Sequence, residues 1–316
     1  MSVRSGVTKP LLPSPLLPGG TIGICAPAGP VKPERLERAI RAIAAEGYEV
    51  TTSPSAFAQR GLFAASDAVR RRELEEMFSR EDVHAVFCAR GGVGSSRLLE
   101  TINTRHIAQS GKPLLGFSDV TVLQWLLWAR ERLVTFTGPL AVEWDGDLSE
   151  RTQRQVFRML GGTADSDLLA DWPRDSIRVL RNGRKAAGRL LPGNLTMIAT
   201  LLGTPYCPDL RGAILLVEDV NEPAHRVDRL LFHLRNAGVL GQISALLVGD
   251  LSGEGNGDNA EHSLLDATRG ETYPVAMNLP YGHGPERMTL PVGGLVEFCS
   301  ETMSLSLLEP VTRAAS

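Results

Sequence analysis

The chain has 316 residues, 43% hydrophobic and 22% charged, with 33 basic and 36 acidic side chains and a formal net charge of −3. This composition is ordinary for a water-soluble globular protein, and the length predicts two domains. A slightly negative charge without basic blocks argues against a nucleic-acid partner. No apolar run approaches the roughly 20 residues that cross a bilayer, so no membrane partner is expected.

Residues 1–20 are expected to form an extended lead-in. Four prolines interrupt this segment, whereas a signal peptide needs an unbroken apolar core. A cytoplasmic location is therefore expected. The cysteines are far apart, form no C-x-x-C pair and lie mostly in apolar runs, which is typical of reduced core residues rather than zinc ligands: Cys25, Cys88, Cys207 and Cys299. No metal or cofactor is expected.

Residues 21–160 alternate strand and helix signals. Apolar runs predict strands over 21–26, 49–52, 83–89, 113–117 and 134–137, and helical spacing predicts helices over 33–47, 67–79, 96–102, 120–131 and 148–160. This rhythm predicts a parallel sheet covered on both faces. Ligands bind such sheets beyond the carboxyl ends of the strands, where the glycine turn 91–94 and Ser118 both fall.

Residues 161–184 are rich in Asp, Arg and Gly and are expected to be a linker. Residues 185–316 then show a mixed α+β pattern. Strands are predicted over 213–217 and 245–249, a helix over 224–237, a polar loop over 252–259, and a terminal hairpin from 294–299 to 303–308.

Ser118 lies where the apolar run 112–117 meets the amphipathic run 120–130. A serine at such a junction projects its hydroxyl from the carboxyl edge of the sheet, and the following backbone N–H groups favour an oxyanion. The turn could therefore supply a nucleophile and part of an oxyanion hole. Ser118 could equally be an ordinary helix N-cap.

A serine nucleophile needs a base, usually a histidine oriented by a carboxylate. Among six histidines, His283 has glycines on both sides, which would let its imidazole enter a cleft; the alternative is a surface-turn histidine. Glu218 and Asp219 end the apolar run 213–217. A carboxylate there suggests a site because burying it unpaired is costly, although one of the two could simply cap the next helix.

The glycine turn 91–94 resembles a phosphate-binding loop but lacks its third glycine, because Arg97 occupies that position. It fits an oxyanion hole beside Ser118 better. Two alternatives remain open. One is a non-catalytic phosphate or nucleotide binder that uses this turn, and the other is a glutaminase-like enzyme that uses Cys88, although the apolar run around Cys88 favours burial.

Taken together, these segments resemble the LD-carboxypeptidase family of serine peptidases. The resemblance rests on RGGVGSSRLL at 90–99 and GFSDVT at 116–121, with further matches at 23–29, 193–195, 202–205, 217–220, 226–229, 282–283 and 290–293. It implies a flavodoxin-like N-terminal domain, a smaller β-rich C-terminal domain and a homodimer. It also implies a triad of nucleophile Ser118, base His283 and orienting Glu218, with oxyanion-hole N–H groups from Asp119 and from Gly91 or Gly92.

Family members with these motifs cleave either muropeptide tetrapeptides, releasing terminal D-alanine, or peptidyl-nucleotide antibiotics. The first substrate is favoured here. Two departures from the family pattern affect the substrate pocket: Val93 replaces a frequent aromatic residue, and Pro192 replaces a glycine. A carboxypeptidase must also recognise a terminal carboxylate, for which Arg90 and Arg97 are candidates.

Overall fold

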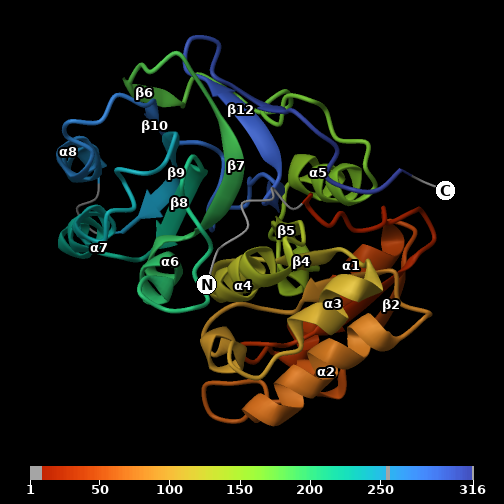
Figure 1. Ribbon diagram of the computed structural model, residues 1–316. Coiled ribbons are helices and arrows are strands. Elements are labelled where there is room, and N and C mark those ends of the chain that lie inside the picture. The colour runs from red at the N-terminus through yellow and green to blue at the C-terminus, as the bar shows by residue number, and fades with distance from the viewer. Residues whose placement is uncertain (1–8, 254–256, 315–316) are drawn as a thin grey trace.

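Residues 9–253 and 257–314 of the computed structural model are described below. They form two units, each built around one sheet (Figure 1). The strand order is β11-β5-β4-β3-β1-β2 in the first sheet and β13-β12-β7-β8-β9-β10-β6 in the second. The chain is thus a two-domain α/β protein, as the sequence predicts.

The first sheet consists of β1 (Thr21–Cys25), β2 (Glu49–Thr52), β3 (Ala85–Cys88), β4 (Leu114–Gly116), β5 (Thr135–Thr137) and β11 (Leu290–Val292). The first five strands are parallel, and β11 pairs antiparallel with β5. Its helices are α1 (Pro33–Ala45), α2 (Asp67–Ser79), α3 (Thr104–Ser110), α4 (Thr121–Glu131) and α5 (Glu150–Leu160). Parallel strands of this kind place their carboxyl ends at one edge of the sheet, which is where a ligand is expected to bind.

The second sheet consists of β6 (Arg178–Arg181), β7 (Lys185–Asn194), β8 (Ile214–Val220), β9 (Ala245–Ser252), β10 (Val275–Met277), β12 (Leu295–Cys299) and β13 (Ser304–Leu307). Strands β7 to β10 are parallel and the remaining pairs are antiparallel. The helices α6 (Leu195–Leu201), α7 (Ala224–Asn236) and α8 (Gly257–Ala267) lie together on one side (Figure 1).

The structure corrects three sequence predictions. The polar loop expected over 252–259 is shorter, because β9 runs to Ser252 and α8 begins at Gly257. Instead of a helix over 96–102, a short 3-10 turn covers Ser95–Leu98, and α3 begins only after Asn103, whose side chain accepts a hydrogen bond from the His106 N–H. Residues 178–181, expected within the linker, form edge strand β6. Its half-exposed, arginine-flanked sequence carries little strand signal. Residues 1–8 of the lead-in and 254–256 of the expected loop lie outside the described residues.

Several contacts hold the two units together, and three of them involve the strands of both sheets or the helix between them. β11 comes from the second half of the chain yet pairs with β5 of the first sheet. The buried Trp125 indole N–H donates to the Pro192 carbonyl at 2.9 Å, and the Asn194 N–H donates to Thr121 Oγ1 at 3.2 Å. A β-carbon at Gly193 would lie only 2.4 Å from Thr121 Cγ2, so α4 needs a glycine there to approach β7.

Pro192 occupies a strand position that prolines usually avoid because they cannot donate to the hydrogen-bond ladder. Strand β12 pairs with β7 only over Lys185–Arg189, so the ladder on that side ends before the proline. The carbonyl of Pro192 still accepts the Trp125 hydrogen bond. In the described part of the chain, no helix is long and apolar enough to cross a membrane.

Candidate active site

Ser118 follows β4 on a sharp turn and adopts a positive φ of 60°. A non-glycine residue in this region is strained, typically by about 1–3 kcal/mol, and such strain often marks a functional site. A β-carbon at Gly116 would lie 2.5 Å from Val120 Cγ1, so the turn requires glycine there. The short helical turn and α4 that follow have Phe117 and Val120 at their N-cap positions, with no side-chain cap, so Ser118 is a half-buried turn residue rather than an N-cap.

The glycine turn packs directly against Ser118. A β-carbon at Gly91 would lie 2.9 Å from Ser118 Cβ, 3.1 Å from its Oγ and 3.4 Å from the Asp119 nitrogen. The Gly91 carbonyl accepts a hydrogen bond from the Gly29 N–H at 3.0 Å, whereas the N–H groups of Gly91 and Gly92 donate to no other described residue. Free backbone donors therefore lie beside the serine hydroxyl.

The Asp119 side chain fixes the two turns to each other. It is buried, and its Oδ2 accepts a hydrogen bond from the Ser95 N–H at 2.8 Å. This bond joins the residue after Ser118 to the end of the glycine turn. The backbone of Asp119 is left to face the same region as Gly91.

His283 comes from the other unit and pairs with Glu218 at the end of β8. Its Nδ1 lies 2.7 Å from Glu218 Oε2. The histidine side chain is 22% exposed and the glutamate fully buried. Because Nδ1 is held by the carboxylate, Nε2 is the nitrogen available to another group. The Phe117 ring, adjacent to Ser118, packs on the imidazole with centroids 4.7 Å apart.

Burial raises the pKa of Glu218 above its ordinary value, and this effect exceeds the opposing influence of His283 and of the Asn194 amide. Asn194 Nδ2 donates to Glu218 Oε1 at 3.2 Å and to Asp219 Oδ1 at 2.8 Å. Asp219 instead binds the start of α6, accepting from the N–H and hydroxyl of Thr196. Glu218 therefore holds the imidazole, whereas Asp219 caps a helix. That helix is α6, which precedes β8 in the chain, and not α7, which follows it.

Ser118 and His283 line one cleft of about 370 Å³ between the two units. The other described residues that line it are Arg35, Arg90, Gly91, Gly92, Leu140, Val142, Glu143, Asp147 and Val220. Ser118, His283 and two residues of the glycine turn, Gly91 and Gly92, therefore line the same cleft. Glu218 lies behind the histidine.

Two residues that the sequence offers as candidates, Cys88 and Arg97, do not line the cleft. Cys88 is fully buried in β3, and its hydrogen bond with Cys25 together with burial raises the pKa of its thiol well above the usual value. A buried, protonated thiol is a poor nucleophile, which argues against a glutaminase-like site. Arg97 pairs with Asp67 at 2.8 Å and lines a separate hollow beside Phe63.

Sequence reasoning missed the partners that support the histidine. Arg287 is buried, forms an ion pair with Glu143 at 2.6 Å, and places its guanidinium 4.9 Å from the centre of the Phe117 ring. The sequence gives Asn194 only as part of the motif at 193–195. Its position just before an apolar helix is typical of an N-cap, and it does accept from the Met197 N–H, but its amide also reaches Glu218.

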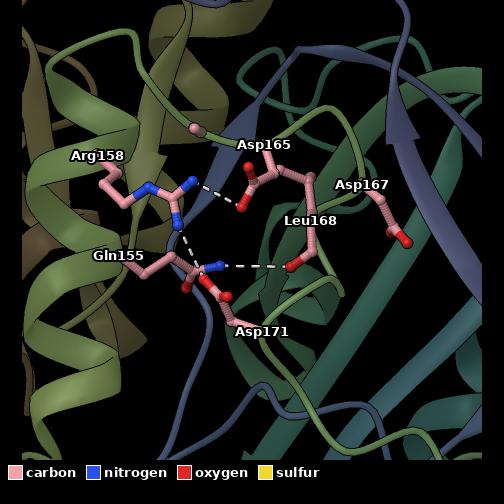
Figure 2. A pocket seen from close by; sticks show the side chains of 7 residues that line it. Gln155, Arg158, Asp165, Asp167, Leu168 and Asp171 are labelled. Carbon is pink, nitrogen blue, oxygen red and sulfur yellow. Dashed lines mark hydrogen bonds and ion pairs between the residues drawn. The ribbon is translucent and has the colours of Figure 1, made fainter.

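Another hollow lies between α5 and the segment 164–171, as Figure 2 shows. There Arg158 bridges Asp165 and Asp171, and the Gln155 amide donates to the Leu168 carbonyl. Its volume is about 10 Å³, room for about one water molecule. Throughout residues 9–253 and 257–314, no group of three or more His, Cys, Asp or Glu side chains is placed to hold a metal ion.

Comparison with known proteins matches both halves of the chain. Residues 22–138 match the LD-carboxypeptidase N-terminal domain, and residues 187–298 match the LD-carboxypeptidase C-terminal domain. The murein tetrapeptide carboxypeptidase of Pseudomonas aeruginosa is 30% identical over 285 residues, covering 87% of this chain and 91% of that protein.

Two solved structures have the same fold. The muramoyltetrapeptide carboxypeptidase from Oxalobacter formigenes is 33% identical, with a TM-score of 0.76 over 91% of this chain and 97% of that one. The microcin C7 self-immunity protein MccF superposes with a TM-score of 0.86 over 96% of this chain and 100% of that one, at 22% identity. The chain belongs to the LD-carboxypeptidase family of serine peptidases.

Proposed function

We propose that this protein releases the terminal D-alanine from muropeptide tetrapeptides by cleaving the bond between an L-configured centre and the D-residue. The observation that carries the proposal is the buried Glu218–His283 pair, which faces the same cleft as the strained Ser118. The similarity to the two muropeptide carboxypeptidases supports this substrate.

In the proposed reaction, Ser118 Oγ attacks the scissile carbonyl carbon while His283 Nε2 takes the hydroxyl proton. Glu218 holds the imidazole by Nδ1 and stabilises its charged form. The tetrahedral oxyanion is bound by the N–H groups of Asp119 and of Gly91 or Gly92. His283 then gives its proton to the departing amine of D-alanine, and water hydrolyses the acyl-enzyme by the same route.

The proposal also covers the domain boundaries, the cellular location and the oligomeric state of the protein. Residues 21–160 form most of the nucleophile domain, and residues 185–316 form most of the domain that carries Glu218 and His283. The connection between them spans residues 161–177, because β6 joins the second sheet, and β11 crosses back to the first sheet. We also propose a cytoplasmic location, which the four free cysteines support, and a homodimer, by resemblance to the family. Light scattering on the purified protein tests the dimer.

The test is an incubation of the purified chain with a disaccharide tetrapeptide, a disaccharide tripeptide and a peptidyl-adenylate, with products identified by mass. We expect D-alanine from the tetrapeptide and no cleavage of the tripeptide. Ser118→Ala should keep the fold, checked by circular dichroism, and lose the activity. Full activity of Ser118→Ala would refute the mechanism. Cleavage of the peptidyl-adenylate alone would favour the alternative that the fold of MccF suggests.

A further inference from the structure

The charged groups lining the cleft are paired, with one exception. Arg35 donates to Asp145 at 2.7 Å and also pairs with Asp147. Glu143 is held by Arg287, and His283 by Glu218. Arg90 is the remaining charged group. Within the described residues no carboxylate lies within ion-pair distance of it, so the cleft presents one uncompensated cation.

Arg90 is held in place without being neutralised. Its Nη1 donates to the Pro30 carbonyl at 2.8 Å, which fixes the guanidinium through one N–H and leaves its other N–H groups available. The residue is exposed on the cleft wall. A guanidinium can bind a carboxylate through two parallel hydrogen bonds, which makes arginine well suited to recognising this group.

Arg90 lines the same cleft as Ser118 and His283 and is the chain neighbour of a residue that packs on the nucleophile. It directly precedes Gly91, whose backbone packs on Ser118. Adjacent Cα atoms are about 3.8 Å apart, so the arginine side chain starts one residue away from the nucleophile's neighbour. In a peptide cleaved at its last bond, the terminal carboxyl carbon is three bonds from the scissile carbon, within about 4 Å of it. A terminal carboxylate therefore lies close to the scissile carbon, inside the cleft that Arg90 lines.

We propose that Arg90 binds the terminal carboxylate of the substrate and thereby makes the enzyme a carboxypeptidase rather than an endopeptidase. This inference rests on the proposed function and deepens it. Arg97 is not a candidate for binding the carboxylate, because it is paired with Asp67 and lies outside the cleft. Arg35 is not a candidate either, because two aspartates already hold its guanidinium.

The test compares a tetrapeptide ending in D-alanine with the same peptide ending in D-alaninamide. Hydrogen bonds to charged groups are strong enough that the wild type should prefer the free acid by roughly 10- to 100-fold in kcat/KM. Arg90→Gln, which removes the charge, should bring this preference to within about twofold, mainly by raising KM for the acid. Arg90→Lys should retain part of the preference, since a point charge remains without the bidentate geometry.

Arg97→Gln is the matched control, a nearby arginine outside the cleft, and it should keep the wild-type preference. An unchanged preference in Arg90→Gln would overturn the assignment. So would a wild type that cleaves acid and amide equally, although that result would leave the proposed peptidase function standing. A wild type that cleaves neither peptide would instead overturn the proposed function itself, and the two failures are therefore distinguishable.

Discussion

Glu218 is fully buried, yet it must carry a charge to orient His283. Burial raises its pKa above 4.5. A raised folded-state pKa means that its contribution to stability is present below pH 4.5 and is lost as pH rises through the folded pKa. Activity needs the carboxylate and should therefore fall as pH drops through that same pKa.

Carbon-13 NMR of labelled glutamate carboxyl groups measures this directly. The resonance missing from Glu218→Gln should titrate above 4.5 in the wild type. A midpoint at or below 4.5 would contradict the account. Glu218→Gln should also lose roughly four orders of magnitude in kcat, since an amide does not hold the imidazole in the required tautomer.

Gly91 is a second residue that tests the site. Alanine there would place a β-carbon 2.9 Å from Ser118 Cβ and 3.1 Å from its Oγ, which displaces the hydroxyl or the N–H beside it. We expect Gly91→Ala to lower kcat by roughly 10²–10³, the effect of losing one oxyanion donor. Gly241→Ala, whose β-carbon meets nothing closer than 3.7 Å, is the control. Equal rates in both variants would argue against the proposed oxyanion hole.

Among the elements, the turn Ala141–Asp145 of the first unit meets the loop after His283 through an ion pair between the half-buried Glu143 and the buried Arg287. Glu143 accepts from the Leu140 N–H at 2.7 Å and from Arg287 at 2.6 Å. Glu143→Gln leaves the Arg287 charge uncompensated and should lower the free energy of unfolding by about 3 kcal/mol. Asp209→Asn, which breaks an exposed pair with Arg211, should leave stability near wild type in the same urea titration. Equal stability of both variants would contradict this assignment.

The sequence predicts those elements whose signal is local. The parallel strands of the first unit and the helices α1, α2 and α4 follow from apolar spacing, and the Ser118 turn lies where two such patterns meet. Strand β11 is only three residues long and joins a sheet built about 150 residues earlier, so no local pattern reveals it. The Glu143–Arg287 pair is equally hidden, because charged residues 144 positions apart resemble surface residues until the chain is folded.

In the whole molecule, the site exists only where the two units meet. Ser118 belongs to the first unit, and His283 and Glu218 to the second, while β11 and the Trp125–Pro192 bond tie the units together. We therefore expect the units to unfold together. Tryptophan fluorescence, far-ultraviolet circular dichroism and loss of activity should show one common midpoint in urea. Two separated transitions would contradict this coupling.

Ser118 and His283 are proposed to act together in one catalytic step, and a double-mutant cycle in kcat measures this coupling. Residues of a catalytic unit are non-additive, so Ser118→Ala, His283→Ala and the double variant should all fall to one residual rate, roughly 10⁶-fold below the wild type. If the two losses multiply in the double variant, or if Ser118→Ala still releases D-alanine at the wild-type rate, the two side chains do not share a mechanism.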